Sequence, residues 1–251
     1  MSKLANFISK VGTALIGDRV VYKGITLPPR HYRLGGQNFR DDAKFVSSAQ
    51  SESRRLVNAF GLNQSTSLLE IGCGYGRLPI GIFTDFGKIT RYEGVDVNPS
   101  AINWCNKYIQ PQYPFAKFTL SNVHNDRYNQ GSNQTSSSLR LPFEDSVFDI
   151  VYMYSVFSHM LTHDVDAYLG EFSRVLKPQG KIFLTAFVEK NVPDCEENPA
   201  NYRQAWKGPL HCVRFDQAFF EGLLGKHGFA TERFVYEQAT DGQSEIYIGR
   251  A

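Results

Sequence analysis

The sequence predicts an α/β protein with a doubly wound, seven-stranded, mostly parallel sheet and a helical segment before it. From Ser67 onward, short apolar runs alternate with stretches of helical periodicity. This alternation is typical of a parallel sheet that helices cover on both faces. The last two apolar runs are joined by a short polar linker, so we expect them to form an antiparallel hairpin.

The sequence divides into an N-terminal helical appendage or lid, residues 1–62, and a core domain, residues 63–251. A second helix of the appendage should begin at Asp41 and end at Phe60, because aspartate is a good N-cap and Gly61 is a good helix terminator. A first helix is expected at the start of the chain, where apolar residues share one helical face: Leu4, Phe7, Ile8, Val11 and Leu15.

The strands of the core are expected where apolar runs have the length of a strand. These runs are residues 67–71, 91–95, 117–121, 148–153 and 181–187, and the closing hairpin should pair 233–237 with 245–249. Helices should begin near Arg77, after Pro99, and at Thr162, which would cap the third of them. Residues 125–140 and 188–213 are expected to be long loops.

Composition restricts the classes of function. The 251 residues carry a formal net charge of +2 and no long run of like charges, which argues against binding to a nucleic-acid backbone. The four cysteines are far apart in the sequence, as expected for free thiols in a reducing compartment. No apolar run is long enough for a membrane span, and the N-terminus lacks the features of a signal peptide, so we expect a cytoplasmic protein.

A glycine-rich turn follows the first core strand, with Gly72, Gly74 and Gly76 in alternate positions. Glycine allows positive φ and lets a ligand approach the backbone, and parallel sheets bind ligands at this edge. Asp96 at the end of the second strand could accept hydrogen bonds from both hydroxyls of a ribose, or it could cap the next helix. Glu70, inside an apolar strand, needs hydrogen-bond donors and could orient the turn and face a ligand ammonium.

Four segments resemble successive motifs of the class I S-adenosylmethionine-dependent methyltransferases: "LLEIGCGYGRL", "YEGVDVNPSAI", "LPFEDSVFDIVYMYSVFSHM" and "VLKPQGKIFLTAF". The resemblance covers about residues 62–187 and implies a Rossmann-like methyltransferase fold with S-adenosylmethionine as cofactor. By analogy, the loop from Gly72 through Cys73 to Gly76 would cradle the methionine part of the cofactor. The resemblance further assigns Asp96 to the ribose, and it places these residues near the adenine or the methyl group: Val97, Asn122 and Ser155. The family often has an acid where this chain has Asn122.

The segment after the fourth strand would face the cofactor methyl group. Its His159 has a side chain whose ordinary pKa lies near neutrality, so it is the candidate general base for an alcohol acceptor. The alternative is a structural histidine that bonds to the backbone. His163, Asp164 and Asp166 could hold a divalent ion together with His159, but a solvated helix start explains these acids as well, so we favour a site without a metal.

Two further segments are candidates for the walls of the site. Tyr32 and Arg33 lie in a segment with rigid prolines and a Gly-Gly hinge, and they could close over the cofactor or the acceptor. A surface turn with solvated arginines is the alternative. In the long loop after the fifth strand, Tyr202 and Trp206 would form the opposite wall, which suits a sugar or a polyketide-like acceptor.

The sequence therefore predicts a methyltransferase that acts on a hydroxyl of a small molecule, a saccharide or a natural product. An N-methyltransferase or a protein methyltransferase on the same scaffold is the alternative, and a non-catalytic cofactor-binding scaffold is a more remote one. The segment after the fourth strand lacks the Asn/Asp-Pro-Pro-aromatic run that is typical of enzymes methylating nucleobase amines. We therefore expect a small-molecule acceptor and no nucleic acid, and a homodimer is compatible with the sequence.

Overall fold

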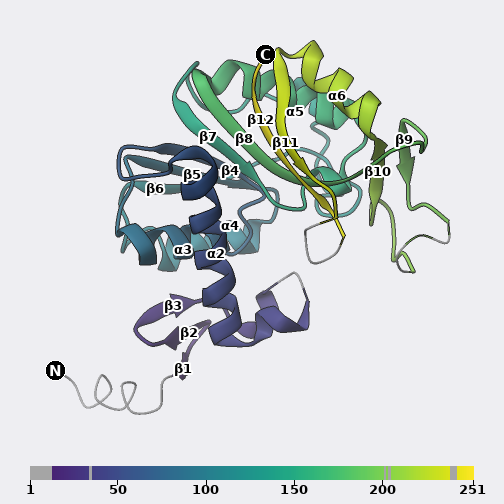
Figure 1. The fold of residues 1–251 in the computed structure, drawn as a ribbon. Helices are drawn as coiled ribbons and strands as arrows, with labels where there is room; N and C mark the ends of the chain where they lie inside the picture. The colour runs from purple at the N-terminus through teal and green to yellow at the C-terminus, as the bar shows by residue number, and fades with distance from the viewer. Residues whose placement is uncertain (1–12, 34–35, 201, 203–204, 238–241) are drawn as a thin grey trace, which may run out of the picture.

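The computed structural model of the chain describes residues 13–33, 36–200, 202, 205–237 and 242–251. Seven strands form the main path of the central sheet. In chain order they are β4 (Ser67–Ile71), β5 (Arg91–Asp96), β6 (Ala116–Leu120), β7 (Phe148–Met153), β8 (Leu176–Glu189), β11 (Phe229–Val235) and β12 (Ser244–Arg250). Their order in space is β11-β12-β8-β7-β4-β5-β6 (Figure 1). The strands from β6 to β8 are parallel, while β12 is antiparallel to both β8 and β11, as the sequence predicts.

Helices cover both faces of this sheet. One hydrophobic core lies under α2 (Asp42–Phe60), α3 (Arg77–Phe86) and α4 (Pro99–Tyr108). The other lies under α5 (Thr162–Val175) and α6 (Gln217–Lys226). The expected helix starts at Arg77 and Pro99 are confirmed, whereas α6 is a helix that the sequence analysis did not predict. Thr162 is the first residue of α5, and Leu161 rather than Thr162 occupies the N-cap position.

The N-terminal appendage is partly a β-structure. β1 (Thr13–Ile16), β2 (Arg19–Tyr22) and β3 (Ile25–Leu27) form a small antiparallel sheet. The predicted first helix is therefore wrong at Leu15, which lies in β1; Leu4, Phe7, Ile8 and Val11 lie outside the described residues. The turn between β1 and β2 accounts for the difference, because Gly17 has positive φ and the tight hairpin turn there pairs Leu15 with Val20 of β2.

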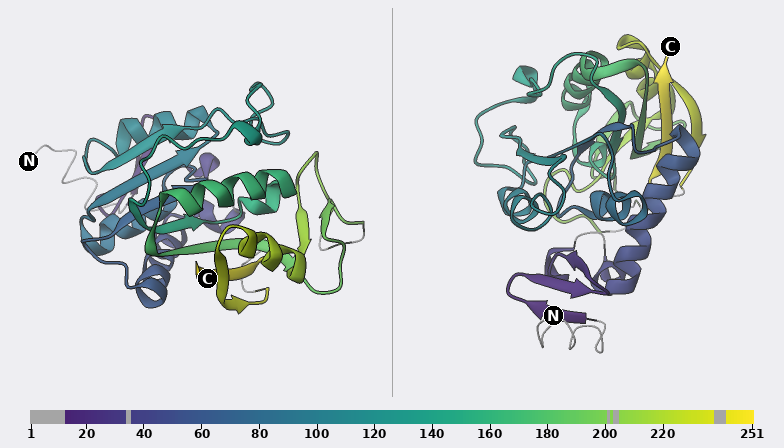
Figure 2. Two further views of the ribbon diagram at one scale, coloured as in Figure 1. Left: turned by 90° about the horizontal axis from the view of Figure 1, so that it is seen from above. Right: turned by 90° about the vertical axis from the view of Figure 1, so that its left-hand side faces the viewer.

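The segment after β3 continues through two short 3₁₀ turns, η1 (Arg30–Tyr32) and η2 (Gln37–Arg40), into α2. The predicted ends of α2 are confirmed: the Asp41 side chain accepts a hydrogen bond of 2.8 Å from the backbone nitrogen of Lys44, and Gly61 ends the helix with positive φ. In Figure 2, α2 runs from the small N-terminal sheet to the closing hairpin. It contacts α3 so closely that a Cβ atom on Gly81 would lie 2.1 Å from the carbonyl oxygen of Ala49.

Two strands lie within or next to the predicted loop 188–213. β10 (Val213–Asp216) pairs in parallel with the end of β8, and β9 (Cys195–Glu197) pairs with β10, which extends the sheet to nine strands. The loop prediction is therefore wrong for part of this segment. Residues 125–140 are irregular, as predicted, with isolated bridges and one 3₁₀ turn, η3 (Ser136–Ser138).

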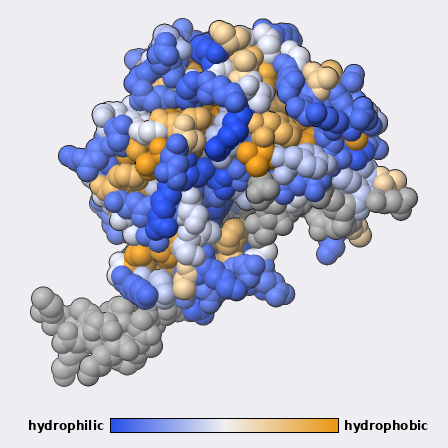
Figure 3. Space-filling model, in the orientation of Figure 1, coloured by the Kyte–Doolittle hydropathy of each residue, from blue (hydrophilic) through white to orange (hydrophobic). Residues whose placement is uncertain are grey.

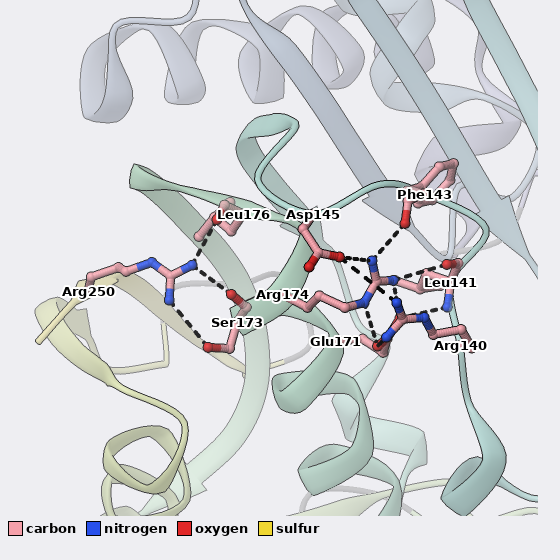
Figure 4. Close-up of polar contacts among 9 residues, drawn as sticks. All are labelled: Arg140, Leu141, Phe143, Asp145, Glu171, Ser173, Arg174, Leu176 and Arg250. Carbon is pink, nitrogen blue, oxygen red and sulfur yellow. Dashed lines mark hydrogen bonds and ion pairs between the residues drawn. The ribbon is translucent and has the colours of Figure 1, made fainter.

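Two arginines hold the carboxyl end of α5 at the edge of the sheet where β7 begins (Figure 4). Arg174 donates hydrogen bonds to the carbonyl oxygens of Phe143 (2.7 Å) and Leu141 (3.0 Å). Arg250, at the end of β12, donates to the carbonyl oxygens of Ser173 (2.7 Å) and Leu176 (2.8 Å). Arg250 thus satisfies carbonyls at the C-terminus of α5, where positive charge is favourable, and Arg174 ties the end of this helix to the loop before β7, so both roles are structural.

The face of the molecule seen in Figure 3 is mainly hydrophilic, with hydrophobic areas between polar residues. Single exposed apolar residues of this kind are normal on a protein surface. Within the part of the chain that the structure describes, no helix has the length and apolar character that a membrane crossing needs.

Candidate functional site

The candidate site lies where the strand order reverses. β4 pairs in parallel with β5 on one side and with β7 on the other, so the carboxyl ends of all three strands meet at one edge. The glycine loop, residues 72–76, follows β4; Asp96 ends β5; and Tyr154 follows β7. Open parallel sheets bind ligands at such a switch point, and the structure brings the glycine loop and Asp96 together here.

The three glycines of the loop differ in what a side chain at their position would contact. All three have positive φ, at 76° for Gly72, 50° for Gly74 and 75° for Gly76. A Cβ atom on Gly72 would lie 2.5 Å from a methyl carbon of Val156, and one on Gly76 would lie 2.3 Å from a methyl carbon of Ile109. A Cβ atom on Gly74 would meet nothing within 4 Å. A side chain at Gly72 or Gly76 would displace Val156 or Ile109, whereas Gly74 faces open space that a ligand can enter.

Cys73 contributes its backbone to this loop. Its backbone nitrogen and that of Gly72 both donate to the carbonyl oxygen of Val95, at 3.2 and 2.7 Å, and so attach the loop to β5. Its thiol is buried, and burial raises the pKa of the thiol well above its ordinary value. The side chain is therefore a packing group under the loop, and the contact of Cys73 with the cofactor stays a prediction for its backbone.

Asp96 connects the end of β5 to the glycine loop. Its carboxylate accepts hydrogen bonds from the backbone nitrogens of Gly74 (2.7 Å) and Asn98 (2.8 Å). Burial raises the pKa of Asp96, and these backbone hydrogen bonds oppose the rise. The helix that begins at Pro99 is capped by Asn98 instead, so capping does not account for Asp96. A carboxylate can accept about four hydrogen bonds, so Asp96 keeps acceptor capacity for a ligand.

Three further residues assigned to the cofactor lie within or just beyond the ends of β4, β5 and β6. Val97 is partly buried directly after β5, and Asn122 is exposed just beyond the end of β6. Glu70 is buried within β4, where it accepts a hydrogen bond from the Tyr92 hydroxyl. Burial raises the pKa of Glu70 to about 8, against the opposing effects of the Tyr92 hydrogen bond and the Arg77 charge. The donor that the sequence analysis required for Glu70 is thus Tyr92.

His159 lies in the 3₁₀ turn η4 (Phe157–His159), after β7. Its Nδ1 atom lies 2.9 Å from the carbonyl oxygen of Leu210, and its ring contacts Tyr128 edge-on at 5.3 Å between ring centres. A carbonyl oxygen only accepts hydrogen bonds, so Nδ1 carries the hydrogen atom. In the neutral ring, Nε2 is then the nitrogen with a basic lone pair.

The N-terminal appendage contacts the glycine loop through aromatic rings. Tyr32 stacks on Tyr75, with 4.8 Å between ring centres and 16° between ring planes. Arg33 is buried and forms an ion pair of 2.8 Å with Asp42, and it also donates to the carbonyl oxygen of Pro28 at 2.9 Å. Arg33 therefore holds the N-terminal appendage together internally, and its contact with a ligand stays a prediction.

The comparisons with known proteins agree with this geometry. Residues 69–184 match a protein family described as "Methyltransferase domain". The chain is 28% identical over 160 residues to a sterol 4-C-methyltransferase of Caenorhabditis elegans, which covers 64% of this chain and 42% of that protein. It is 27% identical over 136 residues to a sterol 24-C-methyltransferase of Schizosaccharomyces pombe, which covers 54% of this chain and 32% of that protein. The chain thus spans less than half the length of these relatives.

A solved structure shares the fold over most of the chain. A magnesium protoporphyrin IX methyltransferase from Synechocystis, with bound S-adenosylmethionine, superposes with a TM-score of 0.55 at 17% identity, over 88% of each chain. Residues 69–184 thus match a methyltransferase family, and the chain has the fold of S-adenosylmethionine-dependent methyltransferases. A second methyltransferase of this type, from Aquifex aeolicus, matches with a TM-score of 0.55 at 16% identity, over 84% of this chain and 99% of the other.

An aromatic cluster lies on the segment whose Leu210 carbonyl contacts His159. Trp206 contacts Tyr202 at 5.7 Å and His211 at 5.4 Å between ring centres. His211 follows Leu210, the residue that holds the imidazole of His159. Arg127 donates a hydrogen bond of 3.0 Å to the carbonyl oxygen of Lys207, which connects the loop 125–140 to this cluster. The structure therefore places Tyr202 and Trp206 on the segment that also positions His159.

The acidic residues near His163 are used in other contacts. His163 is exposed, and its Nε2 atom lies 3.3 Å from Asp164. The Asp164 carboxylate accepts a hydrogen bond from the backbone nitrogen of Leu161, and Asp166 pairs with Lys226 and His227. Among the described residues, no group of three or more His, Cys, Asp or Glu side chains could hold a metal ion.

Several residues of the site escaped the sequence analysis. Tyr75 lies inside the glycine loop but was not assigned a role, although an aromatic residue between two glycines is a signal for a stacking contact. The Arg77 guanidinium lies 4.7 Å from the Tyr154 ring and 5.3 Å from the Phe39 ring, which connects the loop, β7 and η2. Leu210 acts through its backbone carbonyl, a role that no side-chain pattern reveals.

Proposed function

We propose that this chain transfers a methyl group from S-adenosylmethionine to a hydroxyl group of a small molecule. The observation that carries the proposal is the hydrogen bond from His159 Nδ1 to the Leu210 carbonyl oxygen, which leaves Nε2 as the basic nitrogen of the neutral ring. This imidazole follows β7, the strand next to the one that carries the glycine loop. A base at this place suits an acceptor that loses a proton as it is methylated.

The residues at the switch point fit the cofactor. S-adenosylmethionine supplies, when bound, an activated methyl group on a positively charged sulfur. Gly74 faces open space, so the loop can lie against the methionine part. Asp96 has acceptor capacity left for ribose hydroxyls, and Val97 and Asn122 would lie near the adenine. Tyr32, stacked on Tyr75, would cover the loop from the lid.

The role of His159 follows from the charge balance of an O-methylation. A neutral hydroxyl that gains a methyl group must lose its proton, and Nε2 of a neutral imidazole accepts that proton as the O–H bond breaks. General base catalysis of this kind contributes about 10²–10⁴-fold to a rate. The Leu210 carbonyl helps twice, because it selects the tautomer and it stabilises the imidazolium that forms.

Aromatic side chains support a small-molecule acceptor, a saccharide or a natural product. Tyr128, Tyr202 and Trp206 lie on the segments around His159, and aromatic walls with few polar groups are typical of such pockets. A carbon acceptor is the second candidate, because relatives carry the names of sterol C-methyltransferases. An amine acceptor, in a small molecule or a protein, needs a free lone pair more than a base, so it would not require His159.

The test compares His159→Ala with His163→Ala in assays that follow methyl transfer from labelled S-adenosylmethionine to fractionated small-molecule extracts. For a hydroxyl acceptor, His159→Ala should lower kcat by about 10²-fold while the affinity for S-adenosylhomocysteine stays near that of the wild type. His163→Ala should retain activity, because this side chain is exposed. Wild-type activity in His159→Ala would eliminate the proposed base, and it would shift the assignment to an amine or carbon acceptor.

A further inference from the structure

A closed ring of hydrogen bonds lies behind the segment that follows β7. The backbone nitrogen of Ser155 donates to Thr185 Oγ1 at 2.8 Å, and Thr185 Oγ1 donates to Gln243 Oε1 at 3.0 Å. Gln243 Nε2 then donates to Ser155 Oγ at 2.7 Å, which closes the ring. Ser158 Oγ lies 3.1 Å from Ser155 Oγ. The side chains of Gln243, Thr185 and Ser158 belong to residues with 0% exposure.

The donor and acceptor roles in this ring are fixed by chemistry. Thr185 Oγ1 accepts from a backbone N–H, so its single hydrogen atom is available for Gln243 Oε1. The amide of Gln243 must then present Nε2 to Ser155. A buried glutamine without such partners would carry a large desolvation cost. The ring supplies these partners and so explains how the Gln243 amide can be buried.

The ring closes on a residue with an uncommon backbone conformation. Ser155 has a φ of 57°, in the left-handed region that residues other than glycine seldom occupy. Such a conformation persists only where the surrounding structure holds it. The ring holds Ser155 at two atoms, its backbone nitrogen and its Oγ, and both contacts come from strands or strand ends on the opposite side of β7 from the glycine loop.

The conformation of Ser155 sets the position of the residues that form the site. Val156 follows it, and a methyl carbon of Val156 lies 2.5 Å from where a Cβ atom on Gly72 would be. The turn η4 with His159 comes next. A change at Ser155 would therefore move both the contact with the glycine loop and the imidazole.

We infer that Gln243 is a positioning residue, which holds Ser155 in the left-handed conformation and thereby keeps the segment after β7 seated against the glycine loop. The closing hairpin, through Gln243 immediately before β12, thus contributes to cofactor binding without touching the ligand. The inference rests on the family's cofactor, and it depends neither on a hydroxyl acceptor nor on His159 as the base.

The test measures binding of S-adenosylhomocysteine by calorimetry, together with thermal unfolding. Gln243→Met keeps the length of the side chain and removes both hydrogen bonds, so the dissociation constant should rise by about tenfold. Gln217→Met is the matched control, because Gln217 bonds at the surface of α6, and its affinity should equal that of the wild type. Thr185→Val breaks the ring at another point and should weaken binding in the same direction.

A rescue separates positioning from simple packing. Glycine adopts positive φ readily, so Ser155→Gly added to Gln243→Met should recover part of the lost affinity. If Gln243 only packs the hairpin, the second substitution will add its own loss, and the inference is overturned. It is also overturned if Gln243→Met binds the ligand as the wild type does. A wild-type chain that fails to bind S-adenosylhomocysteine would instead refute the proposed function.

Discussion

The carboxylate of Asp96 accepts a hydrogen bond of 2.7 Å from the backbone nitrogen of Gly74. One side chain therefore organises the glycine loop and also faces the place where the ribose is expected. Asp96→Ala should raise the dissociation constant for S-adenosylhomocysteine by about 10–100-fold. This change corresponds to the loss of a hydrogen bond to a charged group, which is worth about 1.5–3 kcal/mol. Calorimetry would measure this change.

Asp85→Ala is the control for the Asp96 prediction, since Asp85 is exposed and bonds to Gln50 at the surface. It should bind the ligand with wild-type affinity. Equal affinity in Asp96→Ala and the wild type would remove Asp96 from the site.

Gly74 and Gly76 should respond differently to alanine. Gly74→Ala places a methyl group in open space, so it should cost about 1 kcal/mol of stability through its positive φ and strongly weaken cofactor binding. Gly76→Ala carries the same cost of positive φ and also places its methyl group against the end of the Ile109 side chain, so it should lose more stability, about 1–3 kcal/mol. Urea unfolding and calorimetry on both variants would separate the two effects. A Gly74→Ala chain that binds tightly would show that no ligand approaches this loop.

The stack between Tyr32 and Tyr75 should contribute to ligand affinity. Aromatic pairs are worth about 0.5–1.5 kcal/mol beyond their buried area, so Tyr32→Ala should weaken S-adenosylhomocysteine binding by about 2–10-fold. Tyr32→Phe keeps the ring and should bind nearly as the wild type does. If Tyr32→Phe loses as much affinity as Tyr32→Ala, the hydroxyl group and not the stack is responsible.

Glu70 should make stability depend on pH. Burial raises its pKa in the folded state to about 8, above the ordinary value of 4.5. Between these two pH values, Glu70 is therefore protonated in the folded chain and ionised in the unfolded chain. The stability linked to this proton is complete below about pH 4.5 and is lost as the pH rises towards 8. Glu70→Gln should remove this dependence and keep an acceptor for Tyr92.

Urea unfolding at pH 5 and pH 8 would test the Glu70 prediction. The wild type should lose at least about 1.4 kcal/mol more than Glu70→Gln over this interval, the equivalent of one pKa unit. Parallel losses in the two proteins would mean that Glu70 titrates near its ordinary value.

The elements that could be predicted are those marked by hydrophobic periodicity and by turn residues in the local sequence. The strand Phe148–Met153 is mostly buried, and a helix starts at Arg77 directly after the glycine loop, so periodicity and turn residues were enough. β10 could not be found in this way, because a four-residue strand owes its existence to pairing with the distant end of β8. Leu15 also fits the apolar face of a helix. It lies in a strand because the tight turn after β1 pairs this segment with β2.

The same division applies to the candidate site. Gly74 and Asp96 could be located because they directly follow or end strands, where ligand contacts are expected. The contact between Gln243 and Ser155 joins residues separated by 88 positions, and the stack of Tyr32 on Tyr75 joins a lid to a loop. Contacts of this kind depend on tertiary packing, which one sequence does not reveal. The buried ion pair of Arg33 was hidden for the same reason.

The close approach of α2 and α3 at Gly81 limits how this enzyme can be recombined with its relatives. A side chain of any size at this position would push the lid-bearing helix away from the core, because the nearest atom is the backbone oxygen of Ala49. A chimera that takes residues 13–62 from another methyltransferase would therefore need a donor helix of the same local shape. The N-terminal appendage and the core would in this sense have to be exchanged together, although they differ in architecture.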